Sequence, residues 1–155
     1  MDRARAKEFL NYWLPALLFS LAILVLSGDL GSSRNTGVLV RWALSWMPGL
    51  TPGQIDLLNG YLRKLGHLTA YGFLFFLWFR ALRGHFHAAR PWSSALWALA
   101  ICLLVSCLDE GHQAWYHSRG GSPWDVALDM VGALLSAVVI SIVSKLRPKP
   151  AGPAG

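Results

Sequence analysis

The chain has 155 residues, enough for one domain, and it is strongly apolar. Hydrophobic residues make up 54% of it and charged residues only 14%, against roughly 25% charged residues in a typical soluble domain. The formal net charge is +6, but the Lys and Arg residues stand beside apolar runs and not on a polar face, so we discount nucleic acid as a partner. The composition predicts an integral membrane protein.

Four apolar runs, each close to the ~20 residues that a helix needs to cross the hydrocarbon core, predict an all-α bundle of four transmembrane helices. They cover residues 9–27, 65–82, 92–108 and 126–143. The first run is long for the apolar core of a signal peptide, so we interpret it as a retained span. We expect a single membrane domain over residues 1–146 and a disordered Pro/Gly-rich cytoplasmic tail over residues 147–155.

The loop between the first two runs, residues 28–62, is too long to be a tight connection. Its apolar residues include Val38, Leu39 and Trp42, and they are interrupted by Arg41. This pattern indicates a short helix lying in the membrane interface with Trp at headgroup depth. A re-entrant packing element is an equally weighted alternative.

The end of that loop carries a helix-start signal. Thr51 is a capping residue, Pro52 suits the first helical position, and Gln54 is placed to reach back to the cap. We expect this helix to continue directly into the second span.

The positions of the basic residues predict the orientation, because short cytoplasmic segments are enriched in Lys and Arg. Nine of the 14 lie in three short segments on one side of the predicted bundle: Arg3, Arg5, Lys7, Arg80, Arg83, Arg90, Lys145, Arg147 and Lys149. That side is predicted to be cytoplasmic, with both termini in the cytoplasm.

Ionisable residues concentrate at the opposite side. Four of the eight acidic residues, Asp109, Glu110, Asp125 and Asp129, fall within one stretch of the last two spans, and His67 marks the corresponding end of the second span. Charges at membrane depth cost several kcal/mol unless they are paired or lead to water. We therefore expect one connected polar site that opens to the extracytoplasmic side.

Helical spacing supports this expectation, since residues three or four apart share a helix face. Three faces result: Asp109 with His112 and Gln113 in the third span, Asp125 with Asp129 in the fourth, and Lys64 with His67 and Tyr71 in the second. The three faces can converge on one cavity.

The two carboxylates of the fourth span are interpreted differently. Asp125 belongs to a capping-box sequence that begins at Ser122, so we favour a helix-capping role for it. Asp129 lies one turn deeper, where capping does not explain it, and we favour a role in the polar site.

The basic candidates also have structural alternatives. Lys64 is equally well explained as a lysine whose stem lies along the lipid while its ammonium group reaches the interface. His67 is alternatively a hydrogen-bonded packing residue. Arg119 is alternatively a loop charge paired with Asp109 or Glu110, in which case it still belongs to the site.

The mixture of side chains bears on the ligand. Carboxylates and imidazoles are metal ligands, so a divalent cation is a candidate, but no spacing here is diagnostic of zinc and we predict no cofactor. Lys and Arg suit phosphate or carboxylate groups. A site with both signs fits a zwitterionic or phosphorylated lipid headgroup, or else neutralises itself.

At these residues the chain resembles the VanZ-like family of bacterial membrane proteins. The matching segments are Arg63-Lys64-Leu65-Gly66-His67-Leu68, Tyr71-Gly72, Asp109-Glu110-Gly111-His112-Gln113, Arg119, Asp125 and Asp129-Met130-Val131-Gly132-Ala133. The resemblance covers residues 61–143, and the first span and its loop match only in layout. It implies a small multi-pass protein of the bacterial cytoplasmic membrane. The family's founding member is associated with low-level resistance to teicoplanin.

The leading hypothesis is a cell-envelope protein whose polar site binds a lipid headgroup or lipid-linked envelope precursor, with Lys64 and Arg119 on its anionic groups. One alternative is a membrane enzyme that hydrolyses or transfers a headgroup, with Glu110 and His112 as acid–base residues. Another is a structural subunit of a larger complex, or a homo-oligomer, whose polar residues form a closed network of ion pairs.

Overall fold

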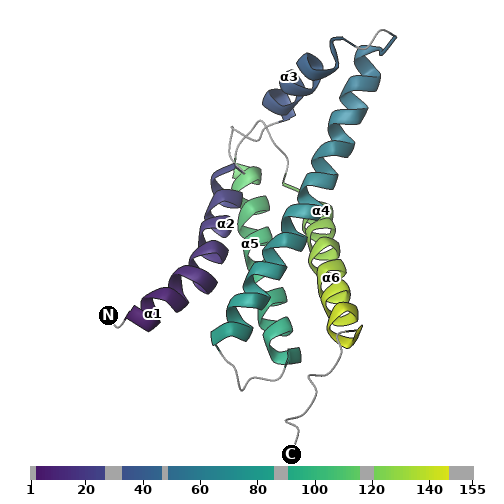
Figure 1. Ribbon diagram of the computed structural model, residues 1–155. Coiled ribbons are helices and arrows are strands. Elements are labelled where there is room, and N and C mark those ends of the chain that lie inside the picture. The colour runs from purple at the N-terminus through teal and green to yellow at the C-terminus, as the bar shows by residue number, and fades with distance from the viewer. Residues whose placement is uncertain (1–2, 27–32, 47–48, 86–90, 116–120, 147–155) are drawn as a thin grey trace, which may run out of the picture.

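The computed structural model describes residues 3–26, 33–46, 49–85, 91–115 and 121–146. All regular elements in these ranges are helices, and four helical stretches of 21, 33, 24 and 24 residues are long and apolar enough to cross a membrane. The predicted all-α fold with four spans is confirmed. The first span begins, and the last span ends, toward the same end of the bundle (Figure 1). The predicted disordered tail, residues 147–155, lies outside the described residues.

The first span combines α1 (Arg3–Glu8), a π-helical turn η1 (Phe9–Trp13) and α2 (Leu14–Leu26). Pro15 stands just after the π turn and has no backbone N–H, so the regular α-helical ladder cannot be complete at this point. The span packs beside α4 (Pro52–His85) through Trp13, whose ring meets Trp78 edge-on, and through Ser20, whose hydroxyl accepts a hydrogen bond from Trp78 Nε1 at 3.1 Å.

The loop between the first and second spans contains α3 (Ser33–Leu44), which packs on the first part of α4. Arg41 and Asp56 form an ion pair at 3.4 Å across this contact. The apolar side chains of Val38, Leu39 and Trp42 are exposed. A short amphipathic helix therefore lies where one was predicted, and its position at the membrane interface stays a prediction.

The second span is one long helix, α4, as the helix-start signal predicted. Thr51 Oγ1 accepts a hydrogen bond from the Gln54 backbone N–H, and Gln54 Oε1 accepts one from the Thr51 backbone N–H. This reciprocal cap starts the helix at Pro52. At 1.5 Å per residue, its 34 residues extend about 51 Å, so α4 is longer than the ~30 Å hydrocarbon core and projects beyond the other helices (Figure 1).

The core of the bundle lies between α4, α5 (Pro91–Trp115) and α6 (Pro123–Leu146). α4 and α6 approach closely, so that a Cβ built on Gly72 would lie 3.1 Å from the Gly132 carbonyl oxygen. Small residues let helix backbones approach this closely in lipid. This close approach fixes the register of α6 against α4. That register determines which polar residues of the two helices lie opposite each other.

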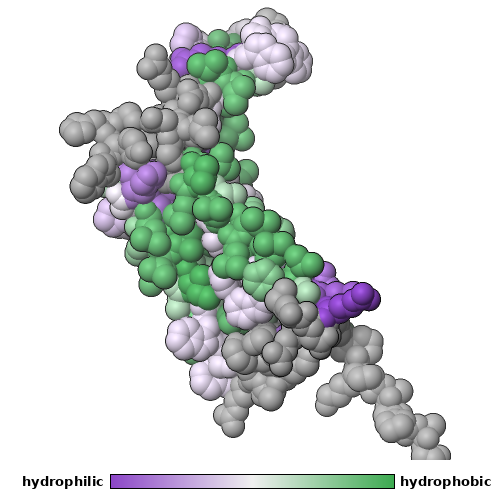
Figure 2. All heavy atoms as spheres, turned by 90° about the vertical axis from the view of Figure 1, so that its left-hand side faces the viewer, coloured by the Kyte–Doolittle hydropathy of each residue, from purple (hydrophilic) through white to green (hydrophobic). Residues whose placement is uncertain are grey.

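The outward side chains of the last two spans are apolar and exposed, including Leu103 and Leu104 on α5 and Val138 and Val139 on α6. Figure 2, a view from the side on which α1 and α2 lie in Figure 1, shows apolar side chains over much of the middle of that face as well. A surface of this kind is stable only in contact with lipid or with another apolar surface. It is therefore the lipid-facing surface of a membrane bundle.

Candidate functional site

Four ionisable residues from three helices meet inside the bundle. His67 comes from α4, Asp109 and Glu110 come from α5, and Asp129 comes from α6; one nitrogen or carboxylate oxygen from each lies within 4.8 Å of the others. We call these four residues the carboxylate–histidine cluster. Asp109 lies six residues before the end of α5 and Asp129 six residues after the start of α6, which is about 9 Å along each helix axis at 1.5 Å per residue.

Asp129 is the most deeply buried member, with 0% of its surface exposed. Its Oδ1 lies 3.1 Å from His67 Nδ1, and its Oδ2 accepts a hydrogen bond from the Ser106 hydroxyl at 2.7 Å. Both carboxylate oxygens therefore have partners, and these partners come from α4 and α5. Asp129 connects all three helices of the core.

Asp109 is held by two neighbours that fix its orientation. The Tyr71 hydroxyl donates to its Oδ2 at 3.3 Å, and the Gln113 side-chain amide donates to its Oδ1 at 3.1 Å. Tyr71 is only 1% exposed and Gln113 only 4%. The carboxylate is thus positioned by buried donors on two helices.

Glu110 differs from the two aspartates in having one satisfied and one unsatisfied oxygen. Its Oε2 accepts a hydrogen bond from the Ser122 backbone N–H at 2.8 Å. Its Oε1 is buried and has no hydrogen-bond partner in the described part of the chain, and the residue as a whole is only 5% exposed. Buried polar atoms are nearly always bonded, so an exception of this kind needs a physical explanation.

The buried face of α5 includes part of the predicted set of residues. Ser106, Asp109, Glu110 and Gln113 are buried, whereas His112 is exposed. Gln113 lies beside Asp109 as predicted, whereas His112, also within one turn of Asp109, is exposed. Sequence reasoning missed Ser106, although its spacing of three and four residues from Asp109 and Glu110 was a usable signal.

The remaining predicted residues lie around the cluster or outside the described ranges. Lys64 is exposed on α4, one turn before His67. Asp125 is half-buried, and the cap of α6 is made by Ser122, whose hydroxyl accepts from the Trp124 N–H at 3.2 Å. The Ser122 N–H, which a capping box would pair with Asp125, instead donates to Glu110. Arg119 lies outside the described residues.

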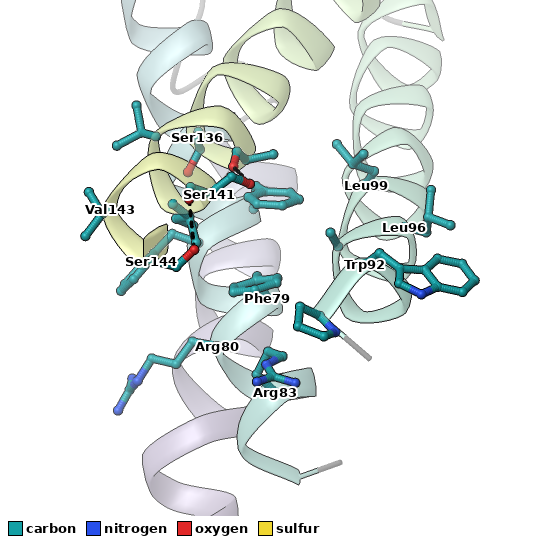
Figure 3. Close-up of a pocket in the computed structure, with 18 of the residues that line it drawn as sticks. Phe79, Arg80, Arg83, Trp92, Leu96, Leu99, Ser136, Ser141, Val143 and Ser144 are labelled. Atoms are coloured by element: carbon teal, nitrogen blue, oxygen red, sulfur yellow. Dashed lines mark hydrogen bonds between the residues drawn. The ribbon is translucent and has the colours of Figure 1, made fainter. Parts of the chain in front are cut away.

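A separate groove of about 1320 Å³ lies between α4, α5 and α6, toward the opposite end of the bundle from the cluster. Figure 3 shows Phe79 on α4, with Leu96 and Leu99 across from it on α5 and Val143 on α6, and Arg80 and Arg83 at one end. No member of the carboxylate–histidine cluster lines it. Its other end reaches Gly72, the residue after Tyr71.

These features define a multi-pass membrane protein with a buried site of carboxylates and one histidine near one end of its helical bundle. The sequence model of the VanZ/LLP1 family matches residues 11–144, and the chain therefore belongs to that family. The resemblance inferred from residues 61–143 is confirmed and extends through most of the first span. Comparison with curated proteins and with solved structures gives no match.

Proposed function

We propose that the carboxylate–histidine cluster is the binding site for the headgroup of a membrane lipid or a lipid-linked envelope precursor. The supporting observation is the unsatisfied Oε1 of Glu110 among buried carboxylates. A network that served only to hold helices together gains nothing from an open oxygen, since each unsatisfied buried group costs about 1–3 kcal/mol. A ligand group that is absent from the resting protein supplies the missing partner.

The chemistry of the cluster limits the part of the headgroup that it accepts. Three carboxylates attract a positively charged group, either an amine or a cation that accompanies phosphate. Lys64, exposed one turn before His67, is placed for the anionic part of a zwitterionic headgroup. Arg119 keeps the same proposed role.

The groove supports a lipid as the ligand class. It begins at Gly72, next to the Tyr71 that binds Asp109, and continues between apolar side chains toward Arg83. The distance from Gly72 to Arg83 along α4 is about 16 Å at 1.5 Å per residue, which is roughly half of the hydrocarbon core. A headgroup at the cluster can thus place its acyl or prenyl chain along this groove.

The test measures lipid that stays bound during purification. Wild-type protein extracted with native lipid into polymer nanodiscs should retain a specific lipid, and Glu110→Gln should reduce its affinity about tenfold or more, because one buried charge contact is worth more than ~1.4 kcal/mol. Asp56→Asn, an exposed carboxylate elsewhere on α4, is the matched control. Equal retention by Glu110→Gln and wild type would remove the proposal.

An enzyme acting on the headgroup is the second candidate. The observation that favours it is the contact between His67 and Asp129, which orients an imidazole within the cluster that contains Glu110. His67 thus replaces the exposed His112 as the histidine placed for acid–base work with Glu110. Conversion of bound lipid to a product over time would favour this reading over simple binding.

We also propose that the protein lies in the bacterial cytoplasmic membrane with its termini in the cytoplasm and the cluster near the extracytoplasmic face. A reporter fused after Lys149 is expected to be active as a cytoplasmic fusion, and one inserted near Arg119 as an external fusion. We expect this orientation because Lys and Arg are enriched on the side of the bundle that contains Lys149. Both reporters on the same side would contradict the proposed orientation.

A link to teicoplanin resistance rests on family membership alone. Expression in a teicoplanin-sensitive host, with Glu110→Gln beside the wild type, supplies a cellular readout for the same site. A resistance phenotype that persists in Glu110→Gln would separate that phenotype from the cluster.

A further inference from the structure

The four members of the carboxylate–histidine cluster offer an unusual combination of donor atoms. They provide one imidazole nitrogen and three carboxylate oxygens from three helices, and each of these four atoms lies within 4.8 Å of the other three. Acidic side chains that gather at random on a surface are exposed, whereas Asp109, Glu110 and Asp129 are 2%, 5% and 0% exposed. Their burial removes the water that would otherwise separate the charges.

The distances match those between ligands of one metal ion. Two ligands at about 2.1 Å from a cation lie about 3.0–3.4 Å apart when they are neighbours in its coordination shell and about 4.2 Å apart when they are opposite. His67 Nδ1 and Asp129 Oδ1 are 3.1 Å apart, the spacing of neighbours. The limit of 4.8 Å on all separations exceeds the distance between opposite ligands of an octahedral shell by about half an ångström, and a tetrahedral Zn²⁺ shell needs a larger contraction by side-chain rotation.

The unsatisfied oxygen of Glu110 is an independent observation that points to a ligand. The Oε1 atom is buried and has no hydrogen-bond partner among the described residues, while Oε2 is anchored by the Ser122 N–H. Carboxylates that bind a metal ion through one oxygen commonly accept a hydrogen bond from a neighbouring group at the other oxygen, as Glu110 does here. A bound cation satisfies the open oxygen directly.

The surrounding hydrogen bonds have the form of an outer shell around metal ligands. Ser106 donates to Asp129, and Tyr71 and Gln113 donate to Asp109. Outer-shell donors of this kind orient ligating carboxylates and commonly change metal affinity by about 10- to 100-fold when they are removed. Here they are supplied by both α4 and α5, so the site is held by the packing of the bundle.

We infer that the carboxylate–histidine cluster binds one divalent cation, with His67, Asp109, Glu110 and Asp129 as its protein ligands. The imidazole favours Zn²⁺, and the three carboxylates also suit Mn²⁺, whereas Ca²⁺ and Mg²⁺ prefer sites made only of oxygen. This inference deepens the proposed function. It rests on the proposed function only for the role of the cation, which would give the acidic site affinity for a headgroup phosphate. The binding of the ion itself does not require lipid.

The test uses purified full-length protein in detergent, stripped of metal with EDTA and free of added lipid. Zn²⁺ and Mn²⁺ are titrated separately by calorimetry, with Ca²⁺ and Mg²⁺ as comparison ions. We expect binding of one ion per chain for Zn²⁺ or Mn²⁺ together with a rise in melting temperature, because an ion that binds only the folded state stabilises it. Absence of both signals for Zn²⁺ and Mn²⁺ would overturn the inference.

Two variants make the assignment specific. Glu110→Gln keeps an oxygen that accepts from the Ser122 N–H, so it should fold while its affinity for the ion falls more than about 100-fold, beyond the loss caused by an outer-shell change. Ser106→Ala removes only the donor to Asp129 and should weaken binding by about 10- to 100-fold. Asp56→Asn is the control and should bind as the wild type does. Wild-type affinity in both Glu110→Gln and Ser106→Ala would show that the ion binds elsewhere.

The outcomes separate this inference from the proposed function. Metal binding without specific lipid retention would support the cation site and remove the headgroup proposal. Lipid retention that persists in EDTA, without any metal binding, would support the headgroup proposal and remove the cation site.

Discussion

Replacing Gly132 with leucine should sharply reduce the amount of folded protein recovered from the membrane. A Cβ at this position would overlap the carbonyl oxygen of Leu68 and would lie 2.9 Å from its carbonyl carbon. These atoms belong to the backbone of α4, so no change of rotamer relieves the contact. Even alanine should cost about 1–3 kcal/mol through overpacking, and leucine should cost more because its whole side chain must separate α4 from α6.

The controls for this prediction come from the same helices. Leu135→Ala removes apolar bulk from the lipid-facing side of α6, where the side chain is half exposed, and should leave the yield nearly unchanged. Gly66→Ala and Gly111→Ala introduce a methyl group where nothing lies within 4 Å, and should be neutral or stabilising by up to about 1 kcal/mol. Yield and melting temperature, measured by fluorescence-detected size-exclusion chromatography, compare all four variants. Equal yields from Gly132→Leu and Leu135→Ala would mean that this face of α6 meets lipid.

The spans of this protein could be predicted from the sequence because the hydrocarbon core imposes a length and a composition on every crossing helix. The start of α4 could also be predicted, because Thr51 and Gln54 act on each other within one turn. Both signals are local. They need no knowledge of which helices become neighbours.

Which residues meet in the site could not be predicted from spacing along one helix, because it depends on how the helices pack together. A spacing of three or four residues allowed Asp109 to share a face with both His112 and Gln113, and only the packing of α5 against α4 and α6 buries Gln113 and leaves His112 exposed. The spacing of Ser106 within α5 does not predict its hydrogen bond with Asp129 of α6. The contact between Glu110 and Ser122 joins two helices across a loop, and helical periodicity does not predict such a contact.

Asp129 and Glu110 should respond to substitution in opposite ways, and this is the largest contrast expected within the cluster. Asp129→Ala removes the partner of His67 and of the Ser106 hydroxyl, which is fully buried. Leaving a buried hydroxyl unpaired costs about 1–3 kcal/mol, and breaking a buried ion pair costs about 3–5 kcal/mol. Because His67 remains partly exposed, we expect a loss near the lower end, about 3 kcal/mol in the free energy of unfolding.

Glu110→Gln removes a charge whose Oε1 has no partner in the described chain, and the amide oxygen still accepts from the Ser122 N–H. Carboxylates held together for function are maintained at a cost in stability, so removing one is neutral or stabilising while function is lost. We therefore expect Glu110→Gln to melt at or above the wild-type temperature in metal-free detergent, and to lose lipid retention and any envelope phenotype. Metal-free conditions matter because a bound ion would stabilise only the wild type.

The comparison is completed by His67→Ala and the double variant His67→Ala/Asp129→Ala. If the two side chains interact as the 3.1 Å contact indicates, their stability losses should fall short of additivity by about 0.5–3 kcal/mol. Unfolding in mixed micelles with increasing sodium dodecyl sulfate measures all the variants on one scale. Should Glu110→Gln unfold as readily as Asp129→Ala, the cluster would be a structural network of ion pairs, and a subunit of a larger membrane complex would become the preferred interpretation of the chain.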